Sequence, residues 1–78
     1  MITIKYFGAI AEKAKTEGEV LSFSNQSLED VITILDQKHE LSALSYSIAV
    51  NQKIIQDLNS YALESNDVIA LLPPFAGG

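Results

Sequence analysis

The sequence of 78 residues contains no cysteine and no arginine. Without cysteine the chain can form no disulfides, thiolate metal sites or cysteine nucleophile, so any sulfur chemistry must use another atom. Without arginine, and with ten acidic residues against five basic ones, nucleic acid is not expected as a partner, because binding it requires cations that neutralise phosphates. The net charge of −5 fits simple solubility, or a partner with a basic docking face.

Long hydrophobic runs and catalytic signatures are also missing. No apolar run approaches the about 20 residues of a membrane span, and the N-terminus lacks the layout of a signal peptide, so a cytoplasmic protein is expected. The sequence has no paired histidine and carboxylate, no glycine-rich phosphate loop and no metal-ligand spacing. An autonomous catalytic site or a metal site is therefore not expected in this single small domain.

Hydrophobic periodicity predicts two strands joined by a short helix in the N-terminal part. Residues 1–7 alternate in polarity as a strand does, although Phe7 falls on the polar face. Residues 9–15 are rich in helix formers and predict a connecting helix of about two turns. Residues 20–23 predict a second strand, so the two strands should form a hairpin with an elaborated loop.

The main helix is predicted to begin after Ser27, which approximates a capping box with Asp30. An apolar stripe at i, i+3, i+4 and i+7 then predicts a helix lying on a sheet: Leu28, Val31, Ile32 and Leu35. The helix should fade near residues 38–40. His39, the only histidine, has no partner cluster visible in the sequence, so we expect a solvated side chain rather than a general base or metal ligand.

The second half of the chain predicts three more strands, over residues 47–50, 53–55 and 68–72. Turns are expected at residues 51–52 and 65–67, with an irregular stretch between them that includes one helical turn at residues 60–63. The last strand is apolar on both faces, which indicates a central strand or one whose outer face meets a partner. Its expected neighbour is the first strand.

This order of elements predicts an α+β domain of the β-grasp (ubiquitin-like) architecture over residues 1–73. A mixed sheet of four or five strands should have one main helix packed across it. On the open face of the sheet we expect Phe7, Ile54 and Leu72 to form an exposed apolar patch that meets a partner. The alternative is that these three are ordinary core residues.

Residues 74–78 are predicted to form an extended C-terminal tail. The proline pair biases the chain towards extended geometry and should launch the tail outward. The glycine pair has no side chains and could enter a channel that a side chain would block. The tail residues that precede the last glycine are Pro73, Pro74, Phe75, Ala76 and Gly77. We interpret this end as the carboxylate of Gly78 held out for chemistry; the alternative is a disordered terminus.

Three stretches resemble the MoaD family, the ubiquitin-like sulfur carriers that are the small subunits of molybdopterin synthase. They are residues 4–12, 49–52 and 66–78. The end is the most specific part, with an acidic turn, an apolar strand, Pro-Pro, two further residues and Gly-Gly. Phe75 stands where the family usually has Val or Ile, and Ala11 stands where a basic residue is common. Both departures concern the fit to a partner.

The resemblance implies that Gly78 is the catalytic residue and that the tail passes through a tunnel in a partner. An α-carboxylate, with a pKa of about 3.5, is an anion and a poor electrophile at pH 7. In the family, an E1-like adenylyltransferase consumes ATP to adenylate it, and a sulfur donor protein then leaves a thiocarboxylate. The large subunit, in a heterotetramer of two small and two large subunits, passes this sulfur to a cyclic pterin (precursor Z) to build the molybdopterin dithiolene. No bound cofactor is implied.

Two other readings remain open. The first is a sulfur carrier of the same build that serves thiamine synthesis or another pathway, against which the Pro-Pro pair and the greater length argue. The second is a non-catalytic interaction or protein-modifier domain in which Gly78 forms an amide with a lysine.

Overall fold

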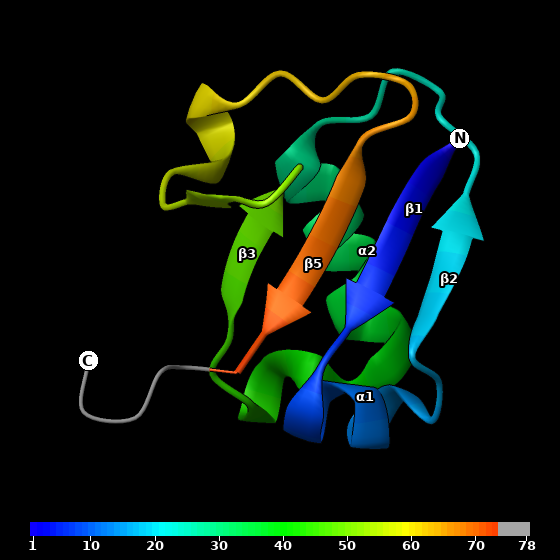
Figure 1. The fold of residues 1–78 in the computed structure, drawn as a ribbon, viewed down its shortest axis with the longest axis vertical. Helices are drawn as coiled ribbons and strands as arrows, with labels where there is room; N and C mark the ends of the chain where they lie inside the picture. The colour runs from blue at the N-terminus through cyan, green and yellow to red at the C-terminus, as the bar shows by residue number, and fades with distance from the viewer. Residues whose placement is uncertain (74–78) are drawn as a thin grey trace.

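The computed structural model describes residues 1–73, which form one five-stranded sheet with helices (Figure 1). In chain order the elements are β1 (Ile2–Tyr6), α1 (Gly8–Ala14), β2 (Gly18–Leu21), α2 (Leu28–His39), η1 (Leu41–Ala43), β3 (Ser47–Val50), β4 (Lys53–Ile55), η2 (Leu58–Ser60) and β5 (Val68–Leu72). In this part of the chain no helix combines the length and the apolar character that crossing a membrane requires.

The strand order is β2-β1-β5-β3-β4. The first and last strands, β1 and β5, pair in parallel at the centre, and every other pair is antiparallel. Helix α2 lies behind the sheet in Figure 1 and covers one of its faces. The structure therefore confirms the predicted β-grasp fold, including the central place of the last strand beside the first.

Alternation along the strands decides which side chains reach the core between the sheet and α2. In β1 the side chains of Ile2, Ile4 and Tyr6 are all at most 2% exposed. The predicted stripe of α2 is buried against them and against alternate residues of β5: Leu28, Val31, Ile32, Leu35, Ile69 and Leu71. The predicted capping box is also present, because the Ser27 hydroxyl accepts from the Asp30 N–H at 3.0 Å.

Several predicted boundaries differ from the structure: α1 spans Gly8–Ala14 rather than residues 9–15, and β2 ends at Leu21 rather than at residue 23. Strand β1 ends before Phe7, which instead precedes α1. Strand β2 begins at Gly18 rather than at residue 20, because a Cβ at Gly18 would lie 2.5 Å from the Ile4 carbonyl oxygen and only glycine allows that approach. The helical turn of the irregular stretch is Leu58–Ser60, two residues earlier than expected, because the Asp57 carboxylate caps it by accepting from the Asn59 N–H at 3.0 Å.

The prediction for His39 was wrong. Its side chain is only 13% exposed, and its Nε2 lies 2.7 Å from Glu19 Oε2. The Glu19 carboxylate also accepts from the Tyr6 hydroxyl and from Lys38 Nζ, each at 2.5 Å. The imidazole packs edge-on against the Tyr6 ring, with 5.4 Å between ring centroids. These four residues, the Glu19 cluster, tie β1 and β2 to the end of α2.

The Glu19 cluster favours the ionised form of its carboxylate. Burial raises the pKa of Glu19, but the hydrogen bonds from Lys38, Tyr6 and His39 outweigh burial, and the pKa falls from 4.5 to about 2. Burial and the adjacent carboxylate raise the pKa of the Tyr6 hydroxyl, which therefore stays protonated as the donor. Because the folded state lowers the pKa of Glu19, its contribution to stability is fully present above pH 4.5 and is lost as pH falls towards 2.

We predict that Glu19→Gln lowers the free energy of unfolding at pH 7 by about 2 kcal/mol, since it removes charge-assisted hydrogen bonds. The difference from the parent protein should shrink as pH falls from 4.5 towards 2. Urea denaturation across this range measures it, with Glu12→Gln at an exposed position of α1 as the control. A difference that is independent of pH would contradict the assigned role of the carboxylate.

Candidate functional site

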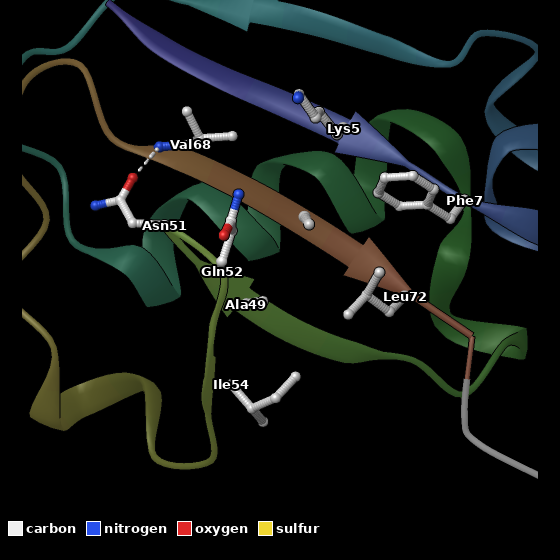
Figure 2. A pocket seen from close by; sticks show the side chains of 9 residues that line it. Lys5, Phe7, Ala49, Asn51, Gln52, Ile54, Val68 and Leu72 are labelled. Carbon is white, nitrogen blue, oxygen red and sulfur yellow. Dashed lines mark hydrogen bonds between the residues drawn. The ribbon is translucent and has the colours of Figure 1, made fainter.

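The face of the sheet that α2 leaves uncovered carries a hollow of about 510 Å³ (Figure 2). We call it the open-face hollow, and strands β1, β5, β3 and β4 all contribute to it. Its lining residues are Lys5, Phe7, Ala49, Asn51, Gln52, Ile54, Val68, Ala70 and Leu72. Lys5 is the only charged side chain among them, so the surface of the hollow is mainly apolar.

The register of the strands explains why this face is hollow. Lys5 pairs with Ala70, Ala70 with Ala49, and Ala49 with Ile54, so these four residues form one row across the sheet. The two alanines stand in the middle of the row and have only methyl side chains. Larger side chains, among them Phe7 and Ile54, stand around them. The alanines therefore form a low floor at the centre of the sheet.

The three side chains predicted to form an apolar patch all line this hollow (Figure 2). Phe7 and Ile54 are each 44% exposed, and Leu72 is partly buried, so none of them belongs to the buried core. Phe7 follows β1 and Leu72 ends β5, where the Phe7 N–H donates to the Leu71 carbonyl oxygen at 3.3 Å. Their contact with a partner stays a prediction.

At the other end of β5 a hydrogen-bond network fixes the rim of the hollow. The Asn51 side chain accepts from the Val68 N–H at 3.0 Å (Figure 2) and donates to Asp67 Oδ1 at 2.9 Å. The Asp67 carboxylate is buried and also accepts from the Glu64 N–H at 2.8 Å and from the Tyr61 hydroxyl at 3.3 Å. This network holds the turn between β3 and β4 against the start of β5.

Turns were predicted from the sequence at residues 51–52 and 65–67, and both contribute to this network. The hydrogen bonds that join the two turns were not predicted. Asn51 and Gln52 have φ values of 52° and 72°, which is the conformation of a type I′ hairpin turn and suits asparagine. One feature of the sequence indicated that Asp67 is buried: it stands directly before an apolar central strand. Its partners lie up to 16 residues away in the chain, so their identity needed the fold.

The tail is rooted at Pro73, the last residue that the structure describes, which is exposed. Strands β1 and β5 are parallel and point to the same edge of the sheet (Figure 1). Pro73, which follows β5, therefore leaves the sheet at the same end as Phe7, which follows β1. The remaining predicted site residues lie outside the described residues, so their roles stay predictions: Pro74, Phe75, Ala76, Gly77 and Gly78. Within residues 1–73 no group of histidine, aspartate and glutamate side chains is arranged to hold a metal ion.

Comparison with known proteins adds a family and several related structures. The ThiS family matches residues 4–78 of the chain. A chain from the protein–protein complex of subunits 1 and 2 of molybdopterin-converting factor from Helicobacter pylori 26695 is 33% identical, with a TM-score of 0.75, and the match covers 99% of this chain and 97% of that one. No curated protein sequence gives a significant match.

Two further solved structures share the fold at lower identity. A putative molybdopterin converting factor subunit 1 from Pyrococcus furiosus is 21% identical with a TM-score of 0.82, covering 95% of this chain and 97% of that one. Small archaeal modifier protein 1 from Haloferax volcanii is 20% identical with a TM-score of 0.79, also covering 95% of this chain and 97% of that one. At these identities the likeness is one of fold.

We predict that Phe7→Ala changes the free energy of unfolding by less than about 1 kcal/mol, because the ring is half exposed. The matched control is Leu71→Ala, a fully buried residue on the neighbouring strand, which should cost about 3 kcal/mol. Urea denaturation of the isolated chain measures both. If Phe7→Ala lowers the free energy of unfolding as much as Leu71→Ala does, Phe7 belongs to the buried core.

Proposed function

Since this chain belongs to the ThiS/MoaD family of ubiquitin-like sulfur carriers, we propose that it is the small subunit of a molybdopterin synthase. In this role Gly78 carries the sulfur that builds the molybdopterin dithiolene. One observation carries the proposal: the relative that is 33% identical over nearly the whole of both chains is part of a complex of molybdopterin-converting factor subunits 1 and 2.

The arrangement of the open face supports this proposal. The open-face hollow is mainly apolar. Two of its side chains, the half-exposed Phe7 and the partly buried Leu72, lie near Pro73, where the tail begins. A partner that covers the hollow would therefore also receive residues 74–78. Exposed apolar surface of this kind marks interaction sites, because covering it removes apolar area from water.

The chemistry begins at the terminal carboxylate, which needs activation. The carboxylate oxygen attacks the α-phosphate of ATP on an adenylating enzyme, pyrophosphate leaves, and an acyl-adenylate forms at Gly78. Hydrosulfide-level sulfur supplied by a sulfur donor protein then attacks the acyl carbon, AMP leaves, and Gly78 ends in a thiocarboxylate. The thiocarboxylate sulfur is a soft nucleophile, and the large subunit directs it to the cyclic pterin precursor.

The chain and its partner divide the work of the reaction. The chain supplies the reagent at Gly78, the extended arm of Pro73 to Gly77 that delivers it, and the docking side chains Phe7, Ile54 and Leu72. Acid–base groups and phosphate contacts are assigned to the large subunit. The Glu19 cluster takes no part, because its carboxylate is already bound by three donors of the same chain.

We predict that co-expression with the adenylating enzyme and a sulfur donor raises the intact mass of the chain by about 16 Da, the exchange of one oxygen for sulfur. A variant that lacks Gly78 is the control and should gain nothing, while its melting temperature stays nearly unchanged. Intact-mass spectrometry reads out both. An unchanged mass, or Gly78 found only in amide links to lysine, would favour a protein modifier over a sulfur carrier.

We further predict that Phe7→Ala or Leu72→Ala raises the dissociation constant for the large subunit by about fivefold or more, as central apolar anchors do. Ile34→Ala is the matched control, since Ile34 is also exposed and apolar but belongs to α2. Isothermal titration calorimetry measures the affinities. Equal affinities for all three variants would show that the open-face hollow is not the docking surface.

A further inference from the structure

Gly8 faces the root of the tail at close range. A Cβ placed on Gly8 would lie 3.1 Å from Pro73 Cγ and 3.7 Å from both Pro73 Cβ and Cδ. The first of these distances is shorter than ordinary van der Waals contact between carbon atoms. The ring of Pro73 therefore occupies space beside the Gly8 backbone that is free only because residue 8 has no side chain.

The same glycine makes the turn that takes the chain from β1 into α1. Phe7 is still extended, with φ −132° and ψ 151°, whereas Gly8 has φ +57°. This left-handed conformation is open to glycine and disfavoured for most other residues. The Phe7 carbonyl oxygen then accepts from the N–H groups of Ile10 and Ala11, at 3.2 Å and 3.5 Å, which starts the helix.

Strand pairing brings these two features together. The parallel pairing of β1 with β5 continues to the Phe7 N–H, which donates to the Leu71 carbonyl oxygen at 3.3 Å. Pro73 has no N–H, so it cannot donate the next hydrogen bond of the ladder to β1. The ring of Pro73 instead lies beside the backbone of Gly8 at the point where the chain leaves the sheet.

We propose that Gly8 is a positioning residue for the C-terminal tail: its bare backbone seats the ring of Pro73 and so sets the direction in which residues 74–78 leave the domain. The consequence for sulfur transfer rests on the function proposed above, whereas the consequence for the direction of the tail does not. A Cβ at residue 8 displaces the ring, and the tail then starts towards the partner from a different angle.

The direction of the tail can be measured without any partner. The chain has no cysteine, so Ala76→Cys provides a single site for a nitroxide label on the full-length protein. Paramagnetic broadening of backbone amides around the open-face hollow and α1 then reports where the tail lies. Gly8→Asn also introduces a Cβ against Pro73 but tolerates positive φ better than Gly8→Ala, which guards against loss of folding.

We predict that both Gly8 variants redistribute the broadening, whereas Gly18→Ala does not. Gly18 is a suitable control because a Cβ there would strain β2 against the Ile4 carbonyl, and no part of Pro73 lies among its nearest neighbours. An unchanged broadening pattern in folded Gly8→Asn overturns the proposal. If Gly18→Ala fails to fold, Glu12→Gln at an exposed site of α1 takes its place.

The effect on transfer is tested with the preformed thiocarboxylate, the large subunit and the pterin precursor. We expect Gly8→Ala to slow single-turnover transfer about tenfold, since small misplacements of a reacting group cost rate steeply. A double-mutant cycle with Pro73→Ala separates two possible causes: the clash of the new Cβ with the Pro73 ring, and backbone strain at residue 8. Removing the ring abolishes the clash but leaves the strain. The effect of Gly8→Ala should therefore be smaller when residue 73 is alanine.

The outcomes distinguish this proposal from the proposed function. If Gly8→Ala slows transfer equally with proline and with alanine at residue 73, Gly8 acts only as a turn residue and its positioning role is overturned. Sulfur transfer by the parent chain would still support the sulfur-carrier function. If the parent chain transfers no sulfur, the proposed function fails, and the broadening experiment alone decides whether Gly8 orients the tail.

Discussion

The parallel pairing of β1 with β5 is the constraint on which the rest of the structure depends. Parallel strands have their carboxyl ends at the same edge of a sheet, so the residues that follow β1 and β5 must leave the sheet side by side. Phe7 and Gly8 at the beginning of the chain are thereby placed against Leu72 and Pro73 at its end. The N-terminal segment thus lies against Pro73, the residue from which the C-terminal tail begins.

Strand alternation then gives the two faces of the sheet different tasks. One face packs against α2 and holds the core, and the Glu19 cluster fastens α2 to β1 and β2 at its end. The other face has alanines at its centre, so it remains hollow and apolar beside the root of the tail. A domain of this kind needs no catalytic side chain, because the reactive group in the proposed function is the main-chain carboxylate of Gly78.

Local patterns predicted much of this structure, and long-range contacts account for what they missed. The stripe of α2, its capping box and the central place of β5 follow from periodicity and composition within short windows, and all three are present. His39 was misjudged because its partner, Glu19, is 20 residues away in the chain. Phe7, Ile54 and Leu72 could be named in advance because large apolar residues stand out in a sequence. Ala49 and Ala70 could not, since small residues give no signal until the strand register aligns them.

The central claim is that the sulfur of the dithiolene comes from Gly78 of this chain. A thiocarboxylated chain carrying isotopically labelled sulfur, mixed with the large subunit and the cyclic pterin precursor, tests it in a single turnover. If Gly78 supplies this sulfur, the label appears in the pterin product and the chain returns to the mass of its carboxylate form. Label that stays on the chain, or that moves only when a thiamine-pathway enzyme replaces the large subunit, would contradict it.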